Sequence, residues 1–91
     1  MNQVSKTLFI KNKLGLHARA ATQLVQLAQS YTSEIMIVCG GKTANANSVM
    51  GLLLLSGATG TEIEVKCQGE DAQAALEAVE ALINARFHEG E

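Results

Sequence analysis

Proline and tryptophan are both absent from this chain of 91 residues, and aromatic side chains make up only 3% of it. The core must therefore be built from aliphatic side chains, which are plentiful because hydrophobic residues account for 47% of the sequence. A chain of this length is typical of one domain, and no linker, repeat or low-complexity tract divides it. We expect a single domain that spans residues 1–91.

Charge of either sign is limited, and so are the apolar runs. Seven basic residues stand against nine acidic ones, which gives a formal net charge of −2, and the basic residues form no run. A nucleic acid is therefore not an expected partner. The longest apolar run, Val49–Leu55, is far shorter than the roughly 20 residues that span a bilayer, and the first residues lack the layout of a signal peptide. The sequence predicts no membrane partner and a cytoplasmic location.

Only two cysteines and two histidines are available for redox or metal chemistry. Cys39 and Cys67 fall in strand-like segments, so we expect reduced and largely buried thiols rather than a disulfide. The cysteines and histidines do not show the close spacing of a metal site. Neither a metal nor any other cofactor is expected.

Apolar residues alternate in four segments and recur at helical spacing in three. Strands are expected at Val4–Lys11, Glu34–Cys39, Lys42–Ala46 and Thr61–Cys67, and helices at His17–Ser30, Val49–Ser56 and from Asp71 to about Phe87. The pair Gly40-Gly41 is typical of a hairpin turn. Strands that alternate cleanly favour an antiparallel or mixed sheet with one buried face, which three helices would cover. The fold class is therefore α+β, in the order β-α-β-β-α-β-α.

The expected helices have identifiable caps and one apolar face each. Ser48 and Asp71 are expected to cap the second and third helices, because their side-chain oxygens can accept backbone N–H bonds. In the first strand, Lys6 is the residue that breaks the inward-facing apolar pattern. The core face of the first helix is expected to carry Ala18, Ala21, Leu24, Val25 and Ala28.

The segment GLHARAA, residues 15–21, places a histidine at the start of the first helix. Gly15 permits a tight turn, and His17 then falls at or next to the N-cap, where backbone N–H groups lack partners and attract anions. A neutral imidazole there is a competent nucleophile. Arg19 lies in the same turn and keeps a positive charge that can face a phosphoryl group. This arrangement favours the acceptance, holding and release of a phosphoryl group by His17, and a purely structural histidine is the alternative.

The stretch NKLGLHARAA, followed later in the chain by ANSVMGLLLLSGATGTEIEV, resembles the HPr family of phosphotransferase-system phosphocarrier proteins over nearly the whole chain. The resemblance implies an open-faced β-sandwich, with a four-stranded antiparallel sheet of order 1-4-2-3 and three helices on one face. It also implies that an enzyme I-type kinase, using phosphoenolpyruvate, phosphorylates His17 on Nδ1. The phosphoryl group would then pass to a IIA-type acceptor, with the Arg19 side chain and the backbone of Ala18 and Arg19 stabilising it. Such a protein is a carrier and not an enzyme.

Within the family, three features resemble the nitrogen-branch (NPr-type) members: NKLG before the histidine, ANSV at the second helix, and the acidic tail FHEGE. We therefore expect a monomeric phosphocarrier of the regulatory nitrogen-related phosphotransferase system. A sugar-branch HPr for carbohydrate uptake is one alternative, and a regulatory module that acts by docking to target proteins is another. The chain departs from the family pattern at Ala20, where proline is usual, and we hypothesise that it still transfers phosphoryl groups.

The start of the second helix carries two further candidates. Ser48 aligns with a serine that a dedicated kinase phosphorylates in some family members, so it is a candidate regulatory phosphosite as well as a cap. The run VMGLLLLS is more apolar than a one-sided helix needs, and the resemblance implies that its exposed part docks partners. The expected docking patch consists of Val49, Met50 and Leu53, extended from the first helix by Leu16, Ala20 and Leu24. A second buried contact under the first helix is the alternative, and His88 is expected to be solvated and without function.

Overall fold

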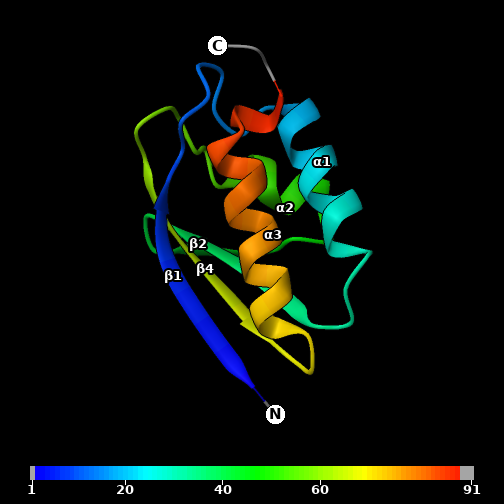
Figure 1. The fold of residues 1–91 in the computed structure, drawn as a ribbon. Coiled ribbons are helices and arrows are strands. Elements are labelled where there is room, and N and C mark those ends of the chain that lie inside the picture. Colours follow the sequence, from blue (N-terminus) through cyan, green and yellow to red (C-terminus); the bar gives the residue numbers. More distant parts are fainter. Residues whose placement is uncertain (1, 89–91) are drawn as a thin grey trace.

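The computed structural model of the protein describes residues 2–88. From the N-terminus the elements are β1 (Gln3–Phe9), α1 (Ala18–Ala28), β2 (Glu34–Cys39), β3 (Lys42–Asn45), α2 (Val49–Leu54), β4 (Glu62–Gln68) and α3 (Ala72–Asn84), followed by the short 3₁₀ turn η1 (Arg86–His88) (Figure 1). The predicted order β-α-β-β-α-β-α is confirmed. Residues 89–91 of the acidic tail, which contributed to the branch prediction, lie outside the described residues.

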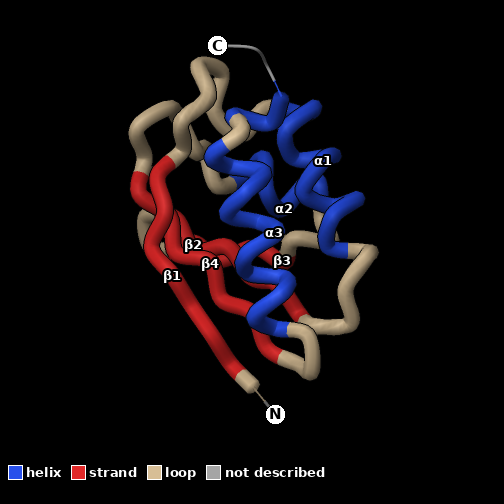
Figure 2. Tube along the Cα trace, in the orientation of Figure 1, coloured by secondary structure: helices blue, strands red, loops and turns tan. Residues whose placement is uncertain are grey.

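The four strands form one sheet in the order β1-β4-β2-β3, and every neighbouring pair is antiparallel. The helices lie on one face of this sheet (Figure 2). The strand residues that point toward the helices are buried, and in β4 these are Ile63, Val65 and Cys67. The structure thus confirms the open-faced α+β sandwich that the alternation and the family resemblance predict.

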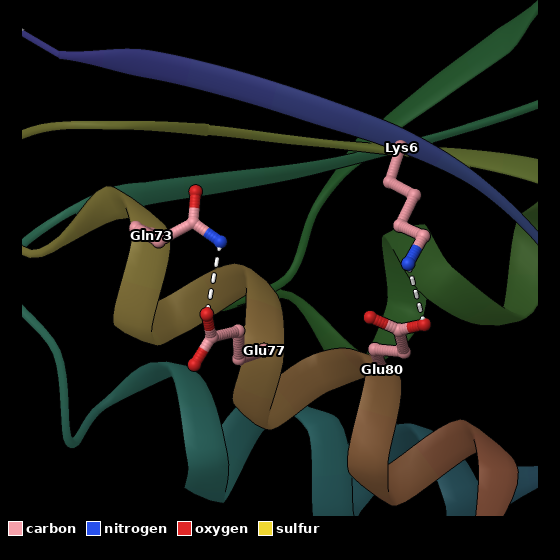
Figure 3. A network of polar contacts seen from close by, with 4 residues as sticks. All are labelled: Lys6, Gln73, Glu77 and Glu80. Atoms are coloured by element: carbon pink, nitrogen blue, oxygen red, sulfur yellow. Dashed lines mark hydrogen bonds and ion pairs between the residues drawn. The ribbon is translucent and has the colours of Figure 1, made fainter.

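Lys6 breaks the apolar pattern of β1 because it reaches an acidic side chain on α3. Its Nζ lies 2.7 Å from Oε2 of Glu80, and the two side chains are 51% and 28% exposed (Figure 3). Gln73 donates a further hydrogen bond of 3.0 Å to Glu77 along the same helix (Figure 3). Pairs as exposed as these contribute at most about 1 kcal/mol to stability, so the core and not this surface network holds α3 on the sheet.

The apolar face of α1 is rotated from the predicted one. Ala18 is exposed, whereas Ala20 is 0% exposed and takes a core position. Ala20 lies four residues before Leu24 and eight before Ala28, so the three share one side of the helix. The predicted burial of Ala21, Leu24 and Ala28 is confirmed.

Residues with positive φ stand between β2 and β3 and after the end of α3. Gly40 and Gly41 have φ values of 58° and 81°, which fits the predicted hairpin between β2 and β3. The last helix ends at Asn84 and not at Phe87, because Arg86, Phe87 and His88 all have positive φ. Phe87 is nevertheless 1% exposed, and its carbonyl oxygen accepts a 2.9 Å hydrogen bond from Nε2 of Gln23 on α1. Phe87 is thus buried in the core, and its backbone is tied to α1.

Asp71 occupies the N-cap position of α3 as predicted, but the prediction that its side chain caps the helix is wrong. Its carboxylate makes no bond to the N–H groups of its own helix. It instead accepts the hydroxyl of Ser33 and the backbone N–H groups of Thr32 and Ser33, at 2.9 and 2.8 Å for the two N–H bonds. The Ser33 hydroxyl and then the Thr32 N–H favour the charged form and lower the pKa of Asp71 from 3.8 to about 2. The carboxylate therefore ties the start of α3 to the segment before β2.

Replacing this carboxylate by an amide is expected to destabilise the fold in a pH-dependent way. Asp71→Asn should lower the midpoint of thermal unfolding at neutral pH, because an amide cannot accept all three bonds at once. Ionised Asp71 stabilises the folded state above the ordinary pKa of 3.8, and this contribution is lost as the pH falls through about 2. The difference in midpoint between the two proteins, followed by circular dichroism, should therefore shrink below about pH 4.

Glu70→Gln is the matched control, since it removes the same charge from the exposed neighbouring side chain. It should leave the midpoint close to that of the parent across the whole pH range. We call the three hydrogen bonds that Asp71 accepts from Thr32 and Ser33 the Asp71 clamp. Equal losses of stability in the two variants would contradict its role.

Candidate functional site

The loop between β1 and α1 turns sharply just before the histidine. Gly15 has φ of 67°, and its N–H donates to the carbonyl oxygen of Asn12 at 3.2 Å. A Cβ at this position would lie 2.2 Å from the carbonyl oxygen of Gly57, so no larger residue fits there. The N–H of Leu16 donates to the same oxygen at 2.7 Å. The glycine turn and the loop before β4 together fix where α1 begins.

His17 is the N-cap of α1, as the sequence predicts. Its backbone is extended, with φ of −86° and ψ of −179°, and its Nδ1 accepts the N–H groups of Arg19 at 3.1 Å and Ala20 at 3.5 Å. A nitrogen that accepts these bonds carries no proton, so the ring proton of the neutral imidazole resides on Nε2. The imidazole is thus held with its nucleophilic lone pair at the positive end of the helix.

The side chains around His17 leave the site open to a partner. The imidazole is half-buried, while the side chains of Ala18 and Arg19 are exposed. The predicted pair of backbone groups was Ala18 and Arg19, whereas the N–H groups that meet Nδ1 belong to Arg19 and Ala20. The contribution of Ala20 was missed, although an N-cap side chain commonly accepts from the second and third helical residues.

The α2 residues of the predicted docking patch are all at least partly exposed. Met50 is 69% exposed, and Val49 and Leu53 are half-buried. Leu54 and Leu14 are 66% and 68% exposed and were not in the prediction. Leu14 was missed because it stands in a loop, where no periodicity shows which way a side chain points.

The extension of this patch from the first helix is wrong. Leu16, Ala20 and Leu24 are only 6%, 0% and 1% exposed, so they add no apolar surface. Ala20 and Leu24 belong to the buried stripe of α1, and the Leu16 side chain packs against Gly57, where an added Cβ would lie 3.0 Å from Leu16 Cδ1. Their burial fixes the position of α1 instead.

Ser48 caps α2 as predicted. Its Oγ accepts the N–H of Gly51 at 3.0 Å, and its backbone is extended. Such a cap stabilises a helix by about 1 kcal/mol. The side chain is also exposed, so the cap and a regulatory phosphosite are geometrically compatible.

Both cysteines belong to the buried core. Cys39 and Cys67 are both free and buried, as predicted. Burial and the nearby charge of Asp71 raise the pKa of the Cys67 thiol to about 11, and a protonated thiol is a poor nucleophile. Within residues 2–88, no group of three His, Cys, Asp or Glu residues could hold a metal ion. The helices of that same stretch are all too short or too polar to span a membrane.

Comparison with known proteins identifies the family. The family described as the PTS HPr component phosphorylation site matches residues 4–85. The chain is 49% identical to the phosphocarrier protein NPr of Shewanella violacea, over 98% of each chain. It is 43% identical to the phosphocarrier protein HPr of Xylella fastidiosa, over 90% of this chain and 92% of the relative. The crystal structure of HPr-C-His from Thermoanaerobacter tengcongensis superposes with a TM-score of 0.90 at 37% identity, over the full length of both chains.

These matches cover nearly the whole chain, and the relatives are named for carrying phosphoryl groups rather than for catalysing a reaction. The structural match agrees with the fold described above. The chain therefore belongs to the HPr family of phosphotransferase-system phosphocarrier proteins.

Proposed function

We propose that this protein accepts a phosphoryl group on Nδ1 of His17 from an enzyme I-type, phosphoenolpyruvate-dependent donor and passes it to a IIA-type acceptor. The observation that carries the proposal is the position of Nδ1, which faces the N–H groups of Arg19 and Ala20 at the start of α1. A helix N-terminus offers oriented donors and partial positive charge to an anion. The nitrogen that attacks phosphorus therefore lies beside backbone donors that can stabilise the product dianion once the ring has turned.

The transfer exchanges one bond to phosphorus for another. The Nδ1 lone pair forms the N–P bond while the donor's bond to phosphorus breaks and its electron pair returns to the donor. Before this step the ring must turn away from the N–H groups of Arg19 and Ala20, because they occupy the same lone pair. The two N–H groups can then donate to phosphoryl oxygens. Their hydrogen bonds to Nδ1 are thereby replaced by hydrogen bonds to the phosphoryl group.

Arg19 supplies the charge that a helix end alone does not. Its guanidinium carries a fixed positive charge and presents several N–H donors in one plane. Because the side chain is exposed and lies two residues after His17, it can reach the phosphoryl oxygens and stays hydrated when no phosphoryl group is bound. An exposed cation also binds an anion only weakly, because water screens the interaction. A weak interaction suits a carrier that must release the phosphoryl group.

Partner docking is assigned to the apolar patch on α2, namely Val49, Met50, Leu53 and Leu54. Flexible methionine and leucine side chains adapt to partners of different shape. A carrier must dissociate from each partner, so a small interface suits it. Ser48, at the start of the same helix, is a candidate regulatory phosphosite, because a phosphate there would add negative charge beside the patch.

The nitrogen-related branch is supported by the comparisons in one respect. The NPr of Shewanella violacea is 49% identical to this chain, whereas the HPr of Xylella fastidiosa is 43% identical. A regulatory role follows from that branch, and a sugar-branch carrier would share the same chemistry at His17. We expect the protein to act in the cytoplasm, as a monomer and as one domain over residues 1–91.

The first prediction concerns the phosphorylated atom. With phosphoenolpyruvate and a cognate enzyme I-type protein, the parent should acquire acid-labile, base-stable phosphate with an N-linked phosphorus NMR signal. His17→Ala should abolish the label, because it removes the imidazole that accepts the phosphoryl group in the proposal. His88→Ala removes the other histidine of the chain and should label normally. Retained labelling of His17→Ala would refute the proposal.

The second prediction concerns the docking patch. The double variant Met50→Ser, Leu54→Ser should raise KM for phosphorylation by the donor about tenfold with little change in kcat, since it removes apolar anchors and no reacting group. Phe9→Ser is the matched control, because Phe9 is 51% exposed and, next to the inward-facing Leu8, points to the uncovered face of the sheet. An equal effect of the control would show that general loss of apolar surface is responsible.

The third prediction concerns the residue where the family usually has proline. Ala20→Pro should change the phosphorylation rate by no more than about twofold, because it removes only the weaker of the two backbone donors, whose bond to Nδ1 is 3.5 Å long, and leaves the Arg19 N–H to bind the phosphoryl group. The helix itself loses nothing, since the first four N–H groups have no partner within it. A large gain with proline would show that alanine impairs transfer. Thermal unfolding of the variant checks that proline fits the buried position.

A further inference from the structure

We propose that Asn12 is a positioning residue, which sets the orientation of His17 through the peptide group between Gly15 and Leu16. The inference rests on the proposed function, because the orientation matters only if His17 accepts a phosphoryl group. Asn12 lies five residues before His17 and touches neither substrate nor phosphorus in the proposed reaction.

Asn12 is unusual in its burial. Of the polar and charged residues within 2–88, only Asn12 and Ser33 are buried, and Asn12 is 0% exposed. A carboxamide is costly to bury unless it is hydrogen-bonded. Its Nδ2 donates to the carbonyl oxygen of Gly15 at 2.7 Å. An aliphatic side chain would fill the same space, so the hydrogen bond is the property that an asparagine adds here.

The bond from Asn12 completes a set of contacts on one peptide group. The Gly15 carbonyl oxygen accepts both Asn12 Nδ2, at 2.7 Å, and the N–H of His17, at 3.0 Å. At the other end of that peptide, the N–H of Leu16 donates to Gly57 at 2.7 Å. Both polar atoms of the peptide are therefore held, and rotation of its plane would break bonds on either side.

The orientation of this peptide determines where His17 begins α1. The N–H of His17 donates to the oxygen that Asn12 holds, and the His17 side chain reaches the N–H groups of Arg19 and Ala20 only from its extended backbone conformation. Without the Asn12 donor the peptide can rock, and the imidazole then samples positions away from the helix axis. A displacement of this kind slows a reaction step without weakening the docking of partners.

The experiment compares two variants that each remove a buried polar side chain. Asn12→Ala should lower the single-turnover rate of phosphorylation about tenfold, while the donor concentration at half-saturation changes little. In NMR spectra of the unphosphorylated protein, it should shift the His17 Nδ1 resonance and speed hydrogen exchange of the Arg19 amide. Ser33→Ala is the control, because Ser33 lies beyond the opposite end of α1 and takes part in the Asp71 clamp. It should lower thermal stability but leave the transfer rate and the His17 signals as in the parent.

The outcomes separate the two proposals. If the parent is not phosphorylated on His17, the proposed function fails, while the resonance and exchange measurements still decide the role of Asn12. If Asn12→Ala and Ser33→Ala behave alike in both measurements, the positioning role is overturned. Should Asn12→Ala not fold, Asn12→Asp keeps the size of the side chain and replaces the donor by an acceptor. In the parent itself, carboxamide hydrogens of Asn12 that exchange as fast as those of the exposed Asn84 would also overturn it.

Discussion

The hydrogen bond between the Arg19 N–H and Nδ1 of His17, 3.1 Å long, is the interaction on which the site depends. It makes one side chain the cap of a helix and, in the proposed function, the acceptor of a phosphoryl group. A serine or aspartate would cap α1 at least as well, but neither offers an uncharged nitrogen nucleophile. The backbone donors of α1 stabilise the imidazole in the structure, and in the proposed function the same donors would stabilise the phosphoryl group.

The remainder of the fold holds that helix end in place. Ala20 and Leu24 bury one side of α1, and Gln23 bonds to the carbonyl oxygen of Phe87 near the chain end. Because the core has little aromatic bulk, α1 is held by many small aliphatic contacts and packs close to its neighbours. Apart from Phe9 on β1, the large exposed apolar residues within 2–88 lie on α2 and in the loop before His17, where a partner can reach them.

The features set by local sequence could be predicted, and those set by distant partners could not. Alternation and glycine turns are local properties, and they were enough for the order of elements, the β2–β3 hairpin and the capping role of His17. Asp71 was assigned to the wrong partner because its carboxylate chooses between its own helix and Thr32, and that choice depends on tertiary structure. The burial of Leu16 and the exposure of Leu14 likewise depend on how the loop lies against Gly57, which no periodicity encodes.

Gly57 meets three demands at once. Its carbonyl oxygen accepts the Leu16 N–H, the same oxygen leaves no room for a Cβ at Gly15, and its missing side chain makes space for Leu16. Substitutions at residues 15, 16 and 57 must therefore occur together, because a methyl group added at Gly15 or Gly57 requires the segment that faces it to move. A mutational library that varies residue 15, 16 or 57 singly would find few tolerated replacements, whereas one that varies the three jointly would reach sequences that single steps cannot.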